Sequence, residues 1–128
     1  MAKNQAAKSD WSGANLVISK AEGVTIVDFH DAAVLDGQAV EAISRDLYAL
    51  IDQHAARKVL LDFRRVQFLS SRMIGVLTEM HKRAGGIKGK VVICGMRPNL
   101  FKVFQTMRLD KLLHFAPDGP EAMRLFSP

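Results

Sequence analysis

Several features that mark secreted, membrane-spanning or disulfide-bonded proteins are absent from this sequence. Cys94 is the only cysteine among 128 residues, so an intramolecular disulfide is excluded and a reducing compartment is the simpler expectation. No stretch approaches the roughly 20 consecutive apolar residues needed to cross a bilayer. Residues 1–13 are polar and lack the apolar segment of a secretion signal. We therefore expect a cytoplasmic protein.

Catalytic and metal-binding motifs are missing as well. The phosphate-binding and nucleophile patterns GxxxxGK(S/T), GxGxxG and GxSxG do not occur. His30, His54, His81 and His114 show no metal-ligand spacing such as HExxH. Cys94 falls in an apolar run, where a thiol is usually a small buried group and a poor nucleophile. We expect no metal, no cofactor and no enzymatic activity.

The charge is positive, +5 overall, which fits an acidic partner, a membrane face or nucleic acid without selecting one of them. The basic residues of the second half are dispersed, and they lack the interleaved exposed aromatics of a single-strand binder. A solvated surface is the simpler interpretation, and a basic nucleic-acid-binding protein is a lower-ranked alternative. These residues are Lys82, Arg83, Lys88, Lys90, Arg97, Lys102, Arg108 and Lys111.

The length suits one compact domain, since two domains would each have too few residues for a core. We expect a flexible tail over 1–13 and a single domain over 14–128. Residues 16–18 and 24–27 are runs rich in β-branched residues and separated by a short turn, which predicts a hairpin. Two strands thus open the domain.

Strands and helices then alternate along the chain. Apolar residues recur with a 3.6-residue period over 40–51, 74–84 and 100–107, whereas 59–61 and 91–94 are short apolar runs typical of buried strands. Weaker patterns predict a strand over 112–115 and a last helix after Asp118. Such alternation favours parallel pairing, so we predict an α/β fold: one mixed, mostly parallel sheet of four to five strands, an opening hairpin and about four helices.

The sequence indicates a functional site at Ser70 and Ser71, where a strand ending at Leu69 meets a helix. A helix start has unpaired N–H groups that favour negative charge, so a phosphate on a serine there would be stabilised. The structural alternative is a helix cap, because serine is a preferred N-cap residue. Both roles are compatible if Ser70 caps the helix and Ser71 points outward. Asp36 is a similar cap candidate for the first helix, or part of the same partner surface.

The segment from Leu60 to Phe115 resembles the STAS domain of anti-sigma factor antagonists. The resemblance rests on Val66-x-Phe68, Ser71, Gly75, Leu77, the pair Gly85-Gly86 and the strand leading to Gly95. In that family the serine after an Asp is phosphorylated by a partner kinase, and only the unphosphorylated form binds the partner. The resemblance implies a STAS-like fold, a phosphoacceptor at Ser71, and partner binding by Ser70, Ser71, Arg72, Met73, Gly75 and Asp36.

Three positions differ from the family pattern. Ser70 stands at the Asp position, Arg72 at the second hydroxyl position and Met73 at the first glycine of Gly-Leu-Gly. A guanidinium offers a fork of donors to oxyanions, so Arg72 can pair with a phosphate at Ser71 or with an acidic partner group.

Two functional hypotheses follow from the resemblance. In the first, the chain antagonises an anti-sigma factor or a related serine-kinase-like partner and is switched by phosphorylation of Ser71. In the second, it is an unphosphorylated STAS scaffold or sensor module that binds other proteins, including other STAS proteins.

Overall fold

The computed structural model describes residues 16–29, 34–35 and 37–126. The expected tail over 1–13 and the candidate cap Asp36 lie outside these residues. The strands are β1 (Val17–Ala21), β2 (Val24–Asp28), β3 (Val34–Leu35), β4 (Lys58–Asp62), β5 (Phe68–Leu69), β6 (Lys90–Cys94) and β7 (His114–Ala116). The helices are α2 (Gly37–Asp52), α3 (Ser71–Gly86), α4 (Pro98–Thr106) and α5 (Gly119–Arg124).

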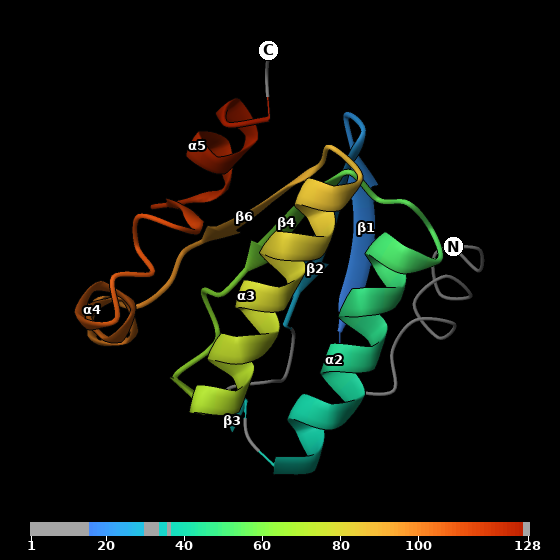
Figure 1. The fold of residues 1–128 in the computed structure, drawn as a ribbon. Helices are drawn as coiled ribbons and strands as arrows, with labels where there is room; N and C mark the ends of the chain where they lie inside the picture. Colours follow the sequence, from blue (N-terminus) through green and yellow to red (C-terminus); the bar gives the residue numbers. More distant parts are fainter. Residues whose placement is uncertain (1–15, 30–33, 36, 127–128) are drawn as a thin grey trace.

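Five strands form the main sheet in the order β1-β2-β4-β6-β7 (Figure 1). β1 runs antiparallel to β2, and the other neighbours are parallel. The hairpin loop is Glu22-Gly23, and both residues have positive φ, 53° and 81°, as a tight two-residue hairpin turn requires. The predicted mixed, mostly parallel sheet with an opening hairpin is confirmed, and β4 is its central strand.

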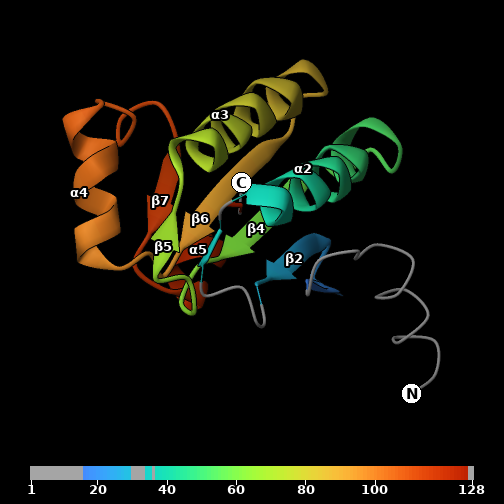
Figure 2. The ribbon, with the colours of Figure 1, turned by 90° about the horizontal axis from the view of Figure 1, so that it is seen from below.

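Both faces of the sheet are covered, because successive residues along its central strands pack into two different core clusters. Val59 and Leu61 of β4 belong to the larger core cluster with α2 and α3, whereas Leu60 between them packs with Ala122 and Phe126 around α5. β6 alternates in the same way. Figure 2 shows α2 and α3 side by side on one face of the sheet and α4 beyond the β7 edge. Fully buried strands of this kind need the continuous apolar runs seen in the sequence.

Helices α2 and α3 run alongside each other and begin at the same end of the molecule (Figure 1). Arg83 of α3 ties them together near their other ends. Its Nη1 lies 2.6 Å from Asp52 Oδ2 of α2, and its guanidinium lies 4.0 Å from the centre of the Tyr48 ring. The first turns of α2 and α3 are therefore held next to each other.

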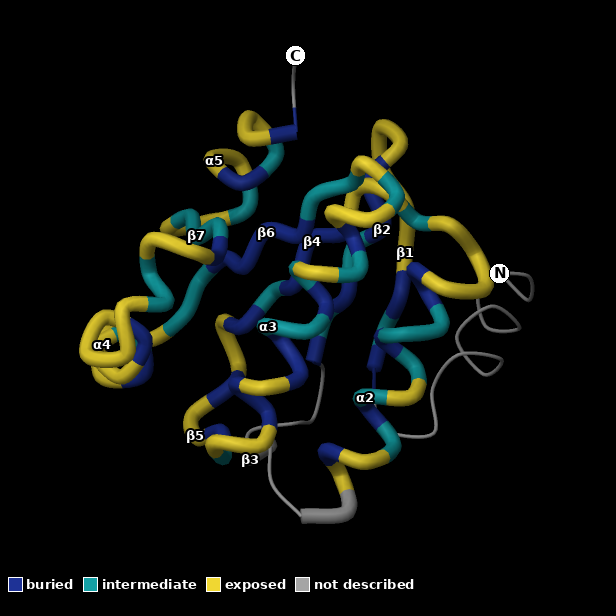
Figure 3. Tube along the Cα trace, viewed as in Figure 1, coloured by how far each residue is buried: buried dark blue, intermediate teal, exposed yellow. Residues whose placement is uncertain are grey.

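Helix α3 ends at Gly86, with Ile87 as its C-cap residue. Two local predictions need correction. The weak strand is His114–Ala116, because Leu112 lies outside it and is exposed. In α4, only Leu100 and Phe104 are buried, whereas Val103 and Met107 are 44% and 51% exposed. Figure 3 shows the outer side of α4 exposed, because this helix meets the edge of the sheet and not its face.

Candidate functional site

Helix α3 begins at a serine that caps it. Ser70 has an extended backbone, φ −81° and ψ 164°, and its Oγ accepts a hydrogen bond from the Met73 N–H at 3.3 Å. The helical ladder starts at the same residue, because the Ile74 N–H donates to the Ser70 carbonyl at 3.2 Å. Ser70 is half-buried. The prediction that Ser70 caps this helix is confirmed.

Ser71 is the first residue of the helix, and it is exposed. Because Ser70 satisfies the cap, the Ser71 hydroxyl is not needed to begin the helix. The first turn of α3 holds no acidic side chain. The N–H groups and the positive end of the helix dipole are therefore free of a competing carboxylate from the helix itself.

Phe68 and Leu69 place this helix start at the surface. They form β5, which pairs in parallel with β3 in a small two-stranded sheet next to the main one. Leu69 is buried and anchors the segment, whereas Phe68 is 48% exposed. An exposed phenylalanine three residues before Ser71 gives the surface an apolar contact point that a partner can cover.

Arg72 provides the charge of the site. Its guanidinium pairs with the carboxylate of Glu41 on α2, and both side chains remain about half or more exposed, at 65% and 49%. An ion pair this exposed contributes about 0–1 kcal/mol, so it can exchange for a stronger partner. Sequence reasoning missed Glu41, because the contact joins two helices 31 residues apart and no local spacing reports it.

Gly75 completes the exposed surface one turn after Ser71. A Cβ built on it meets no atom within 4 Å, so packing does not require glycine here. The absence of a side chain leaves the helix backbone open beside Ser71 and Arg72. We name the exposed set Phe68, Ser71, Arg72 and Gly75 the β5–α3 corner.

Two predicted contact residues, Ser70 and Met73, are not part of this corner. Ser70 is half-buried and caps the helix. Met73 is fully buried in the core with α2 and the sheet, so its side chain cannot meet a partner. It replaces a small residue of the family pattern by filling the interior and not by changing the surface. Asp36, the other predicted partner residue, lies outside the described residues.

The end of the central strand is a structural site. Asp62 accepts hydrogen bonds from the Arg64 N–H at 3.0 Å and from its Nε at 2.9 Å. Nearby Cys94 is buried, and desolvation raises the pKa of its thiol to about 12. A thiol with such a pKa is un-ionised at neutral pH and is a poor nucleophile.

The described residues contain no cluster of three or more histidine, cysteine or carboxylate side chains that could hold a metal. None of their helices is long and apolar enough to cross a membrane. The fold does bring His81 and His114 together, with ring centres 5.7 Å apart, although their sequence positions gave no sign of it.

Comparison with known proteins places this geometry in a family. The family model described as STAS domain matches residues 15–122. A curated relative from Bordetella bronchiseptica, named as the anti-sigma factor antagonist BtrV, is 27% identical over 90 residues, covering 70% of this chain and 75% of the relative.

Solved structures agree on the fold. An anti-sigma-factor antagonist (STAS) domain protein from Planctomyces limnophilus superposes with a TM-score of 0.79 at 24% identity, covering 91% of this chain and all of the other. The Bacillus cell fate determinant SpoIIAA in its phosphorylated form superposes with a TM-score of 0.67 at 21% identity, covering 86% and 98%. Since the family model spans most of the sequence, this chain belongs to the STAS domain family.

Proposed function

We propose that this protein is a regulator of the anti-sigma factor antagonist type, which binds an anti-sigma factor or a related serine-kinase-like partner through the β5–α3 corner. Phosphorylation of Ser71 releases the partner. The proposal rests on the different positions of two adjacent serines: Ser70 caps the helix, and Ser71 is exposed at its first turn.

This arrangement allows a modification without refolding. A phosphate adds about −1.5 to −2 charges and three acceptor oxygens, which a docked partner surface has no room to solvate. The same charge is tolerated by the protein, because it lies at the positive end of α3 and beside the Arg72 guanidinium. Phosphorylation therefore acts on the complex and leaves the fold intact.

Two relatives support this assignment. BtrV is named as an anti-sigma factor antagonist, and SpoIIAA, also described as one, has been solved in unphosphorylated and phosphorylated forms. A protein with the same fold can thus carry a phosphate and remain folded.

The experiment is phosphorylation by candidate anti-sigma serine kinases with ATP, followed by intact-mass measurement. We expect one added phosphate on the wild type and on Ser70→Ala, and none on Ser71→Ala. Ser70→Ala is the matched control, since it removes the neighbouring hydroxyl but leaves the acceptor. A phosphate that persists in Ser71→Ala would contradict the proposal.

The second candidate function is a scaffold that binds partners through the same corner and is never phosphorylated. The Arg72–Glu41 pair favours it, because a basic side chain stands where the family pattern has a hydroxyl. Retained binding of a partner by a protein that no kinase modifies would favour this candidate over the first.

A further inference from the structure

The end of the molecule opposite the β5–α3 corner carries a concentration of positive charge. There α3 ends and strands β4 and β6 begin (Figure 1). A hollow of about 360 Å³ lies at this end, and four of its lining residues are the cations Arg57, Lys58, Lys88 and Lys90. We call it the basic hollow. Leu125 and Phe126, after α5, close one side of it.

Backbone pairing brings the cations together. Lys58 and Lys90 are register partners on the parallel strands β4 and β6, so their side chains leave the sheet on the same face, on strands about 4.8 Å apart. The Lys90 N–H also donates to the Arg57 carbonyl at 2.6 Å. Sheet pairing therefore fixes the backbone positions of Lys58 and Lys90, and the hydrogen bond holds the Arg57 backbone beside Lys90.

The loop before β6 allows its backbone to approach that of Arg57 closely. A Cβ on Gly89 would lie 2.5 Å from the Arg57 carbonyl oxygen, so only glycine lets the two backbones approach. Lys88, just before it, has a φ of 60°, in the left-handed region. The turn thereby holds Lys88 and Arg57 next to each other, on segments 31 residues apart.

These charges lack acidic partners among the described residues. No described Asp or Glu lines the hollow. The ion pairs among the described residues are made by Arg64, Arg72, Arg83 and Arg124, none of which lines the hollow. Lys90 instead donates from Nζ to the Leu125 carbonyl at 2.8 Å, which fixes the ammonium at the wall. Clustered like charges repel, so a bound anion would reduce the electrostatic repulsion among these cations.

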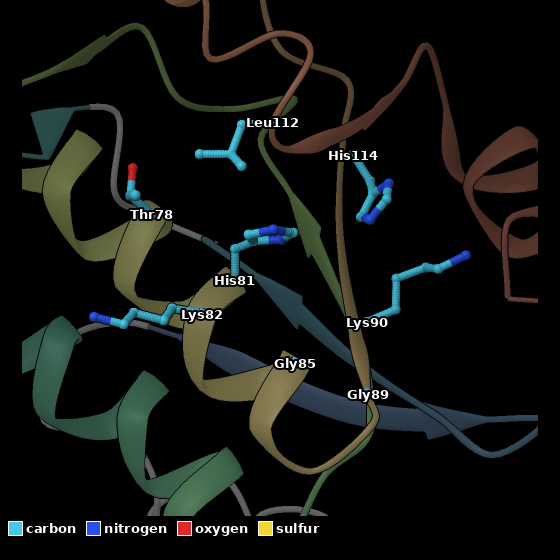
Figure 4. Close-up of a pocket in the computed structure, with 8 residues that line it drawn as sticks. All are labelled: Thr78, His81, Lys82, Gly85, Gly89, Lys90, Leu112 and His114. Carbon is cyan, nitrogen blue, oxygen red and sulfur yellow. The ribbon is translucent and has the colours of Figure 1, made fainter.

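A second hollow, of about 390 Å³, shares Gly89 and Lys90 with the first. Figure 4 shows His81 and His114 facing each other across it. Burial, with help from Lys90 and His81, lowers the pKa of His114, which disfavours the charged form of its ring. Two lysines, Lys82 and Lys90, line the second hollow, whereas four permanent cations line the basic hollow, so the anion should sit in the basic hollow.

We propose that the basic hollow binds the phosphate groups of a small phosphorylated ligand through Arg57, Lys58 and Lys88, with Lys90 at its wall. The hollow is concave and of the size of small-molecule sites, whereas a membrane needs a broader, flatter basic surface. Its one aromatic, Phe126, is only 9% exposed, so it offers no platform for stacking nucleic-acid bases. A guanidinium among ammonium groups suits phosphate oxygens.

The test is titration of the full chain with inorganic pyrophosphate, followed by calorimetry and by backbone amide NMR. We expect saturable binding, with the largest shifts at 57–58 and 88–90. Arg57→Gln with Lys88→Gln should weaken it about tenfold or more, because two charge-assisted contacts are lost. The matched control, Arg97→Gln with Lys102→Gln, removes the same charges from exposed positions at α4 and should leave affinity within about twofold.

Each other outcome would overturn the proposal. Absent or non-saturable binding excludes the site, and equal weakening in both double variants shows only a general effect of net charge. Tighter binding to duplex DNA or to phosphatidylserine vesicles than to pyrophosphate, lost in the first double variant, would assign the hollow to those partners instead. Urea unfolding of each variant checks that the fold is unchanged, and Ser71 phosphorylation reports separately on the proposed function.

Discussion

Substitution of the two serines at the start of α3 should have opposite consequences for stability and for regulation. Ser70→Ala removes the cap to the Met73 N–H. Loss of a serine cap costs about 0.5–2 kcal/mol, and the 3.3 Å distance lies beyond the usual 2.7–3.2 Å range, so we expect the lower part, about 0.5–1 kcal/mol. Unfolding entropy near 2.1 cal/mol/K per residue gives about 270 cal/mol/K for 128 residues. The melting temperature should fall by about 2–4 °C.

Ser71→Ala should change the free energy of unfolding by less than about 0.5 kcal/mol, because Ser71 is exposed and does not cap the helix. Alanine is also the better helix former. Urea unfolding followed by far-UV circular dichroism, with thermal melts in parallel, measures both variants. If Ser71→Ala lost as much stability as Ser70→Ala, the second serine would be part of the cap and the division of roles would be refuted.

Four further predictions concern other residues. Gly75→Ala should stabilise the fold by about 0.5–1 kcal/mol, because its Cβ enters open space, yet weaken partner binding in calorimetry by covering the docking surface. Gly89→Ala should lower the free energy of unfolding, measured by urea titration, by more than about 1 kcal/mol, since its Cβ would meet the Arg57 carbonyl. Cys94 should resist thiol reagents at pH 8 until urea unfolds the protein, because burial raises its pKa to about 12; rapid labelling of the native form would contradict this. The lowered pKa of His114 means that the unfolded chain binds a proton before the native one does, so its contribution to stability is full above about pH 6.5 and declines as pH falls through the lower native pKa; urea unfolding across this range, with His114→Gln as control, measures it.

The fold was predictable because its signals are local or periodic. A helix was predicted from the apolar stripe around Ile43 and Leu47, and the central strand from the short apolar run at Val59 to Leu61. The amphipathic period of α4 did not predict how much of its apolar face is buried. A 3.6-residue period shows which residues share a face, but not how much of that face the sheet covers. Val103 and Met107 remain 44% and 51% exposed.

The site was predictable only in part, for the same physical reason. The serine pair at a strand-to-helix junction signals a cap by itself, and the family resemblance singled out Ser71. Burial of Met73 depends on tertiary packing, and the Arg72–Glu41 pair depends on how two helices lie side by side. The convergence of Arg57 with Lys88 follows from the register of β4 and β6, which no short stretch of sequence contains.

The measurement that tests the account most directly is the affinity of an anti-sigma partner for this protein before and after phosphorylation, by calorimetry. The account predicts binding of the unmodified protein and of Ser71→Ala, and about a hundredfold or more weaker binding of the form phosphorylated at Ser71, because the added charge is placed in the docked surface. Equal affinity of the two forms would contradict the central claim.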